Sequence, residues 1–376
     1  MARTAVRLGP PAAAGGAQPG ADPPRGVLGL TRPLVVAGLL CALVALFLLT
    51  IAAGSVTIPL DDVVRIVVGG EPARPAWTTI VTDIRLPRAI TATLAGAGLG
   101  VGGLLMQTLF RNPLADPFIL GISAGASLGV ALVVLVAGSA GTTLVGGLAV
   151  AGNVGVAGAA AAGAAVVTVA VLAVSRRMTS PATVLIIGLM FGYAATAVVS
   201  VLVYSGFGRF ERIRAFIAWG FGSFGGTTWT QLRVLVPCVL VGLVVAALLT
   251  KQLNALLLGD RYAASMGLHV ARARTVIVLA ASLLAGVVTA FCGPIAFIGV
   301  AVPHMARGLL RTSDHRLLVP AVVVVGGIVA LTAGLVAQLP GQDATLPLNA
   351  VTSLVGAPVV VVILMRLRHA SQAVVT

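Results

Sequence analysis

The chain has 376 residues, of which 59% are hydrophobic and 9% are charged, whereas an ordinary soluble domain carries about 25% charged residues. Its formal net charge of +14 would fit a nucleic-acid-binding protein, but the arginines stand singly or in pairs between long apolar runs instead of forming a basic patch. The composition therefore excludes an ordinary soluble protein, predicts no nucleic-acid partner, and favours an integral membrane protein surrounded by lipid.

Long stretches of the sequence contain no Asp, Glu, Lys or Arg. These charge-free stretches are 34–60, 89–110, 117–175, 178–208, 234–250, 275–303, 317–342 and 344–365. Crossing the hydrocarbon core of a bilayer takes about 20 apolar residues in a helix. The stretches lack the alternating polarity of transmembrane strands, so helices are the remaining way to satisfy the backbone in lipid. The sequence predicts an all-α integral membrane protein.

The first 33 residues differ from the rest of the chain. They are rich in Pro, Gly and Ala and carry four arginines, which predicts a disordered tail on the cytoplasmic side. A cleaved secretory signal is the competing interpretation. The polar lead is too long for it, and the apolar run 34–54 exceeds the h-region of roughly 7–15 residues that such signals contain.

Dividing the apolar runs at their Gly, Pro and Arg positions predicts about ten transmembrane helices. They are expected at 34–54, 88–110, 117–138, 152–174, 183–204, 232–250, 272–292, 294–311, 317–338 and 347–366. An even number places both termini on one side of the membrane. Most of the basic residues then lie in the segments on the side of the tail, so the positive-inside bias predicts cytoplasmic N- and C-termini.

The chain has no motif for nucleotide binding. Lys251 is the only lysine and follows Leu-Leu-Thr, so no phosphate-binding GxxxxGK[ST] loop exists. If a nucleotide drives this protein, another subunit must bind it.

The cysteines and histidines of the chain do not form the pattern of a disulfide, a metal site or a catalytic site. Three cysteines, Cys41, Cys238 and Cys292, lie inside apolar runs, which favours small buried side chains over disulfides. Four histidines, His269, His304, His315 and His369, lack the spacing of metal ligands. No nucleophile, base and orienting residue stand in a recognisable arrangement. The sequence therefore predicts neither a metal site nor an enzyme.

Several short motifs follow one another along the chain. They are Arg85-Leu86-Pro87-Arg88, Arg111-Asn112-Pro113-Leu114-Ala115-Asp116-Pro117, Leu258-Gly259-Asp260, Met266-Gly267-Leu268, Gly293-Pro294-Ile295-Ala296-Phe297-Ile298-Gly299, Pro303-His304, Asp314-His315-Arg316 and Gly356-Ala357-Pro358. In this order they resemble the FecCD permease family of ABC importers, which move iron siderophores, haem or cobalamin. The resemblance covers residues 34–368.

The resemblance implies a ten-helix permease domain, 34–368, with the type II ABC importer architecture in a bacterial plasma membrane. Such a permease pairs with a second permease chain and receives substrate from an extracytoplasmic binding protein. Two separate ATPase subunits, which bind ATP and Mg, drive it, so no cofactor is expected in this chain. Family frequency favours an iron siderophore, with haem or cobalamin as alternatives, and leaves open which chelate moves and whether the dimer is homomeric. An ion-gradient-driven carrier is a distant alternative, because the spans lack ionisable residues.

The resemblance assigns ATPase coupling to the inner segment 254–272. The residues that match the coupling pattern are Leu258, Gly259, Asp260, Arg261, Ala263, Met266 and Gly267. Asp260 is expected as a helix N-cap and Gly267 as a helix stop. The competing interpretation is an interfacial helix lying on lipid headgroups.

On the outer side, the resemblance assigns binding-protein docking to Arg85 and Arg88. The alternative is that both arginines anchor the second span at the headgroups. The chain departs from the family pattern before its last span, where Gly334, Gln338 and the run 345–349 (Thr-Leu-Pro-Leu-Asn) replace an acidic residue, an arginine and Glu-Leu-Pro-x-Gly. The missing arginine leaves its effect on docking open, and Arg209, Arg212 and Arg214 are candidates to replace it.

The resemblance also places a translocation path along the fifth and tenth spans. The candidate residues are Met190, Tyr193, Thr196, Thr352 and Ser353, although each could equally face a neighbouring helix. Thr179 and Ser180, in the loop 178–183, resemble the cytoplasmic gate of the family.

Overall fold

The computed structural model describes residues 25–54, 56–137, 153–175, 181–205, 210–338 and 345–372, and these form helices and turns without a strand. Seven of the helices are long and apolar enough to cross a membrane. Three shorter apolar helices, Ile122–Val136, Ile298–Leu310 and Leu348–Val362, stand where the other expected spans lie. The predicted all-α membrane fold is confirmed.

The elements follow one another in a single chain of helices. They are α1 (Arg25–Ala52), α2 (Leu60–Val68), α3 (Ala76–Thr79), the π-helix η1 (Ile80–Arg85), α4 (Leu86–Phe110), the 3-10 helix η2 (Pro117–Leu120), α5 (Ile122–Ala131), the π-helix η3 (Leu132–Ala137), α8 (Asn153–Ser175), α9 (Pro181–Tyr204), α10 (Phe210–Gly220), α11 (Trp229–Leu248), α12 (Thr250–Leu257), α13 (Asp260–Ser265), α14 (Val270–Cys292), α15 (Ile298–Leu310), α16 (His315–Gln338) and α17 (Leu348–Gln372). α1 begins at Arg25 instead of near Leu34, and the rest of the expected tail, 1–24, lies outside the described residues.

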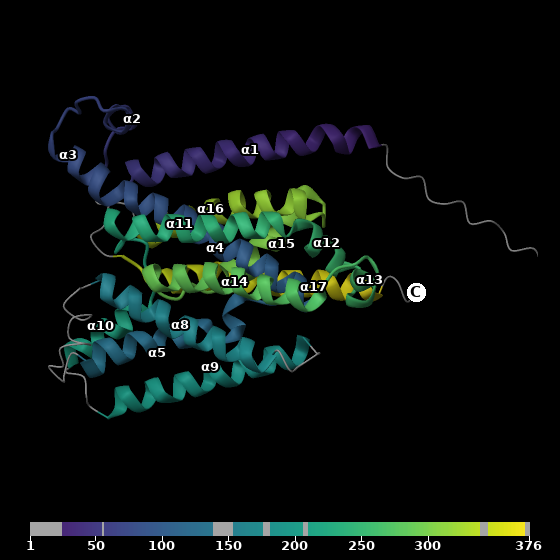
Figure 1. Cartoon of the computed structure of the whole chain (residues 1–376). Coiled ribbons are helices and arrows are strands. Elements are labelled where there is room, and N and C mark those ends of the chain that lie inside the picture. The colour runs from purple at the N-terminus through teal and green to yellow at the C-terminus, as the bar shows by residue number, and fades with distance from the viewer. Residues whose placement is uncertain are drawn as a thin grey trace, which may run out of the picture.

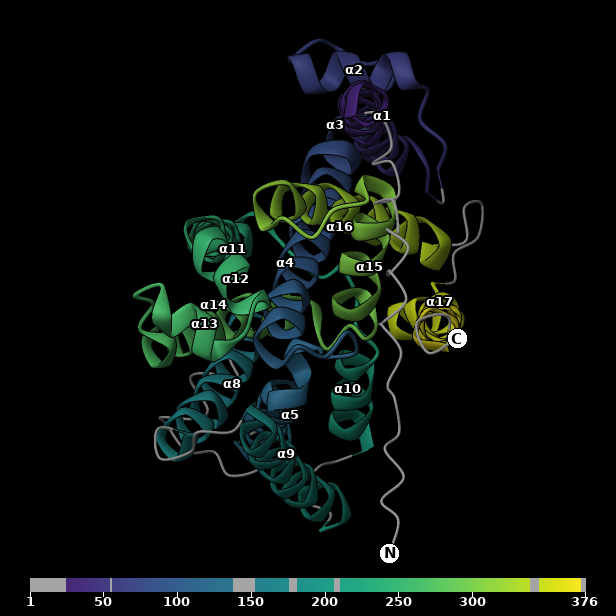
Figure 2. The ribbon, with the colours of Figure 1, turned by 90° about the vertical axis from the view of Figure 1, so that its right-hand side faces the viewer.

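The long helices run roughly side by side and give the molecule two ends (Figure 1). α2, α3 and α10 lie at one end, which we call the α2 end, and α12 and α13 lie at the other, the α13 end. Viewed along the bundle, α4 occupies the middle, with α16, α11, α14 and α15 around it (Figure 2).

The centre of the bundle is held together by close approaches at glycines of α4. A Cβ atom at Gly96 would overlap the carbonyl oxygen of Gly326 in α16, and one at Gly103 would overlap the carbonyl oxygen of Gly299 in α15. Small residues let helix backbones meet directly, which strengthens van der Waals packing in lipid. The glycines of the second span therefore form a packing surface.

One span is shorter than its apolar run because the chain does not return directly into a helix after α14. Gly293, with φ of 72°, ends α14, and Pro294 lacks the N–H that would continue it. Phe297 then adopts a left-handed conformation with φ of 69°, and α15 begins only at Ile298, beside α4. Irregular backbone at this depth is tolerated where protein surrounds it.

Candidate functional site

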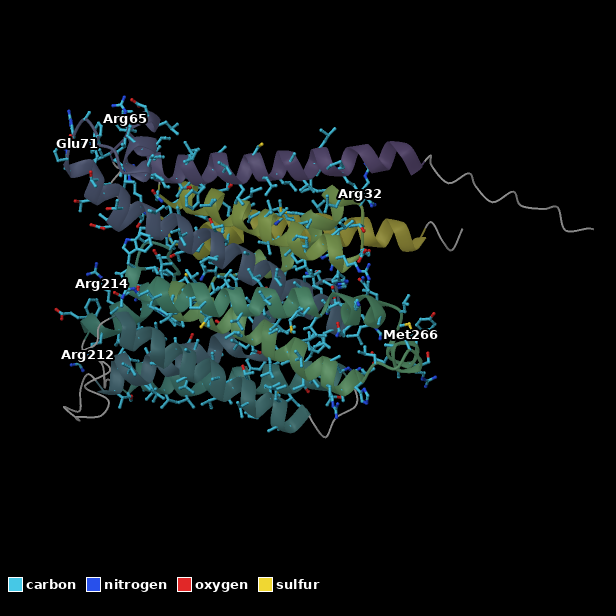
Figure 3. All side chains as sticks on the ribbon, turned by 45° about the horizontal axis from the view of Figure 1, so that its top comes forward. Arg32, Arg65, Glu71, Arg212, Arg214 and Met266 are labelled. Carbon is cyan, nitrogen blue, oxygen red and sulfur yellow. The ribbon has the colours of Figure 1, made fainter. Side chains whose placement is uncertain are left out.

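The segment expected to couple to an ATPase forms the tip of the α13 end, where Met266 projects from the ribbon (Figure 3). Gly259 and Gly267 bracket α13 with φ of 114° and 85°, conformations that only glycine adopts without strain. Gly259, and not Asp260 as expected, occupies the N-cap position, and Asp260 is the first helical residue. Gly267 does stop the helix, as predicted, because its N–H bonds to the Ala264 carbonyl.

The coupling residues divide into an exposed set and an inward set. Leu258 is 64% exposed and Met266 is 53% exposed, and Arg261 is also exposed. Ala263 is fully buried and anchors α13 to the bundle. The segment therefore presents two exposed apolar side chains, Leu258 and Met266, at the two ends of a short helix that packs through Ala263, and we call this element the α13 knob.

Asp260 joins the knob to two long helices. One carboxylate oxygen accepts a bond from Arg111 Nη2 at 2.7 Å, and the other accepts one from Arg274 at the start of α14. Arg111 closes α4 in a left-handed conformation with φ of 46°, and its Nε also donates to the Leu256 carbonyl at 3.3 Å. Charge-assisted hydrogen bonds thus tie α13 to the ends of α4 and α14.

A second junction connects α12 to α4 and α16. The Asn254 side-chain oxygen accepts from the His315 backbone N–H at 3.0 Å and from its ring Nδ1 at 2.7 Å. The ring Nε2 then faces the Thr108 hydroxyl at 2.8 Å. His315 is 1% exposed, so it lies inside the bundle and not among the headgroups.

The same asparagine also contacts the turn before α16. Its Nδ2 donates to the Asp314 carboxylate at 2.6 Å, and the Arg316 backbone N–H donates to that carboxylate at 3.0 Å. The Arg316 N–H, followed by the Asn254 amide, holds the pKa of Asp314 below its usual range. Asp314 therefore stays ionised and fixes the start of α16 against α12.

At the α2 end, Arg85 is not placed as a docking residue needs. It is 6% exposed, and its guanidinium Nη1 donates to the carbonyls of Ile51 at 2.8 Å and Ala52 at 2.7 Å, while Nη2 bonds to the Val56 carbonyl. These carbonyls belong to the end of α1 and the chain after it, where a cation complements the helix dipole. The expected two-arginine docking surface is therefore reduced to Arg88.

We expect Arg85→Leu to destabilise the protein, because buried carbonyl oxygens at the end of α1 would lose their donor, at roughly 1–3 kcal/mol. The thermal unfolding midpoint of the detergent-solubilised protein should fall by several degrees. Arg65→Leu is the control, since the Arg65 side chain is 61% exposed. Equal midpoints for the two variants would contradict the capping role.

Arg88 lines a cavity of about 220 Å³ at the α2 end, together with Ser223, Phe224 and Thr345. With the amide of Gln338 turned so that its oxygen faces Arg88, it accepts bonds from Arg88 Nε at 3.1 Å and Nη1 at 3.2 Å. Gln338, which stands where the family pattern has an arginine, thus orients Arg88. Arg212 and Arg214 lie at the same end (Figure 3), and Arg209 lies outside the described residues.

An open groove of about 420 Å³ runs between α5, α9 and α10, and it contains two of the expected path residues. Tyr193, 66% exposed, and Thr196 line it, opposite Ser123 and Ser127 of α5. Met190 is exposed on the same helix, at 54%. The groove offers hydroxyl groups on an otherwise apolar surface.

The other expected path and gate residues are placed differently. Thr352 is 6% exposed, and its hydroxyl donates to the Asn349 carbonyl of its own helix at 3.3 Å. It lines a separate cavity of about 270 Å³ between α15, α16 and α17, and not the groove. Ser353, next to it, is half-buried. Thr179 and Ser180 lie outside the described residues.

The polar residues that join the helices, among them Asn254, Thr108 and Gln107, were not predicted from the sequence. The Gln107 side chain accepts from Arg307 at 2.7 Å and donates to the Val300 carbonyl at 3.2 Å, which joins α4 to α15. Each of these residues is a single amide or hydroxyl side chain inside or beside an apolar run. A polar side chain in such a place needs a hydrogen-bond partner, and this is the feature by which the sequence could have indicated them.

Comparisons with known proteins show which family the chain belongs to. A model of the FecCD transport family matches residues 42–366. The vitamin B12 import system permease protein BtuC of Klebsiella pneumoniae subsp. pneumoniae is 35% identical over 331 residues, which cover 88% of this chain and 93% of that protein. The protein of the same name from Escherichia coli O9:H4 is 34% identical over 301 residues, covering 80% of this chain and 88% of the relative.

A solved structure is also similar. It is described as an inward-facing conformation of a putative metal-chelate type ABC transporter, and it matches with a TM-score of 0.76 and 25% identity. The match covers 89% of this chain and 99% of that chain.

Proposed function

The chain belongs to the FecCD transport family and is an ABC importer permease, and on that premise we propose that it carries a large metal chelate into the cell. Cobalamin is the first candidate, because the relatives at 34–35% identity are vitamin B12 permeases that align over most of their length. A ferric siderophore is the second, because the similar solved structure is described only as a metal-chelate type transporter.

The observation that carries the mechanism is the α13 knob. An ATPase subunit that holds Leu258 and Met266 in a groove can move α4 and α14 through the bonds of Asp260 to Arg111 and Arg274. A rigid, bonded element transmits a rigid-body shift between subunits. We accordingly assign the α13 end to the cytoplasmic side and propose cytoplasmic N- and C-termini, in accord with the positive-inside bias.

The face formed by α9, α10 and α17 is proposed to meet the second permease chain. Its exposed apolar residues include Met190 and Val201 on α9, Ile217 on α10, and Leu354 and Val355 on α17. The groove with Tyr193 and Thr196 opens on this face, so the chelate would pass between two chains, along a surface with a few hydrogen-bonding hydroxyls.

Reconstitution in proteoliposomes with candidate ATPase and binding-protein subunits tests the function. Uptake of radiolabelled cobalamin and of a ferric siderophore is measured separately, with and without ATP. We expect uptake of one chelate that requires ATP and survives dissipation of proton and sodium gradients. Uptake that collapses with the gradient, or that the chain supports alone, would contradict the proposal.

Arg88 is the proposed docking residue for an acidic group of the binding protein. We expect Arg88→Ala to weaken binding-protein affinity roughly tenfold at low salt, since a charge-assisted hydrogen bond is lost. Surface plasmon resonance on the complex in nanodiscs measures this. Arg65→Ala, at the same end and exposed, is the matched control, and an equal effect of the two substitutions would argue for general electrostatic attraction only.

A further inference from the structure

Three chain segments meet at the α2 end, beside the proposed translocation groove. They are the C-terminal end of α10, the irregular stretch 293–297 before α15, and the start of α17. Viewed along the bundle, α10 lies between α9 and α17 (Figure 2). The junction therefore joins α10, which borders the groove, to the 293–297 stretch and to α17.

One side chain bridges all three segments. Asn349, in the first turn of α17, donates from Nδ2 to the Gly220 carbonyl at 3.1 Å, and its Oδ1 accepts from the Ala296 N–H at 2.9 Å. Its backbone N–H also donates to the Phe221 carbonyl at 3.1 Å. All these partners are backbone groups that otherwise lack a place in a helix ladder, so the asparagine satisfies three orphan positions.

Two glycines with positive φ bring the backbone segments that Asn349 bonds close together. Gly222, with φ of 72°, and Gly293, with the same φ, face each other so closely that a Cβ on Gly293 would overlap the Trp219 carbonyl. The Ser223 N–H donates to the Cys292 carbonyl at 2.8 Å. The end of α10 is thus seated on the 292–296 stretch, with Asn349 bonded to both.

The body of α10 is held far less firmly than its end. No residue of α10 is buried, and its main packing is against α5 and η3. Phe216, in the same helix, lines the groove that holds Tyr193 and Thr196. Within this chain α10 is fixed at its C-terminal end and lightly packed along its length, and its exposed Ile217 lies on the face proposed to meet the second permease chain. A pivot of α10 about its fixed end would therefore be felt at that interface.

We propose that Asn349 is a positioning residue that clasps the C-terminal end of α10 to the 293–297 stretch and to α17, so that α10 pivots at this point and follows α15 and α17 when they move. The consequence for transport rests on the proposed function, because it assumes that the chelate passes along the groove beside α10.

A nitroxide label on α10 tests the clasp directly. Ala215 is exposed on α10, and Ala215→Cys in a Cys41→Ser background accepts the label in the assembled complex. Asn349→Asp keeps the size of the side chain but replaces the Nδ2 donor by an oxygen, and Asn349→Leu keeps the size without polar atoms. We expect both variants to increase label mobility in the spectrum, whereas a label at the exposed Thr332 of α16 should be unaffected.

Transport supplies the second readout. For Asn349→Asp we expect ATP-driven chelate uptake to fall roughly fivefold, because one neutral hydrogen bond is lost. ATP hydrolysis by the complex should persist. Ala350→Asn is the matched control, because it adds an amide at the neighbouring exposed position and leaves the clasp intact. It should match the parent in both readouts.

The two assignments fail in different ways. Label mobility at position 215 that is unchanged in Asn349→Asp and Asn349→Leu would overturn the clasp, whatever the uptake. Increased mobility in a complex whose parent imports no chelate would support the clasp and contradict the transport function.

Discussion

Gly103→Leu is expected to abolish folding of the bundle. A Cβ at Gly103 would overlap the Gly299 carbonyl oxygen, so even alanine forces α4 and α15 apart. Overpacking a tight interior usually costs about 1–3 kcal/mol and sometimes more. Leucine adds three further carbon atoms at a contact between backbones that cannot give way. Fluorescence-detected size-exclusion chromatography in detergent should show no monodisperse peak, and Gly103→Ala should give a peak with a lowered thermal midpoint.

Two glycines in other spans provide matched controls. A Cβ at Gly38 in α1 or at Gly158 in α8 meets no atom within 4 Å. Gly38→Leu and Gly158→Leu should therefore elute like the parent. If Gly103→Leu gave the same profile and midpoint as these variants, the close approach of α4 and α15 would not be a feature of the native protein.

Asp260→Ala is expected to uncouple ATP hydrolysis from transport. The substitution removes the carboxylate that joins the α13 knob to Arg111 and Arg274. The Asp260 side chain is 40% exposed, so its loss should change the free energy of unfolding by no more than about 1 kcal/mol. Uptake per ATP hydrolysed should nevertheless fall at least about tenfold, or about 1.4 kcal/mol of coupling.

A double-substitution cycle separates this effect from a general loss of charge. Arg111→Ala combined with Asp260→Ala should lower uptake no further than the larger single effect, because Asp260→Ala already removes the Arg111–Asp260 connection along with the one to Arg274. Glu71→Ala removes an exposed carboxylate at the opposite end and should leave uptake unchanged. Additive effects of the two α13-end substitutions, or intact uptake in Asp260→Ala, would contradict the coupling route.

The two arginines of the Arg85-Leu-Pro-Arg88 motif show where sequence reasoning stops. The motif predicts two cations at the mouth of a span, and nothing in its letters separates their roles. In the structure Arg85 bonds to Ile51 and Ala52, 34 and 33 residues earlier, whereas Arg88 faces a cavity beside Gln338. Which arginine is buried depends on where the end of α1 comes to rest.

The segment 254–272 also separates what neighbouring residues encode from what distant residues decide. Its two glycines and its exposed apolar residues were predictable, because turns and short helices are encoded by neighbouring residues. The partners of Asp260 were not, since Arg111 lies 149 residues away in the chain. The N-cap prediction for Asp260 failed because its carboxylate is engaged by arginines of α4 and α14 instead of by its own helix.

The sequence by itself determined the class of this protein, the approximate positions of its apolar helices and its family, because apolar run length, Gly and Pro breaks and ordered motifs are all properties of adjacent residues. Only the tertiary structure decided that Arg85 is buried, that Thr352 turns away from the groove, and that Asn349 joins α10 to α17. The burial of Arg85 and the bonds of Asn349 depend on contacts between segments that are apart in the chain, 34 and 33 residues for Arg85 with Ile51 and Ala52 and 129 residues for Asn349 with Gly220, and no local pattern records which distant carbonyl a side chain will meet.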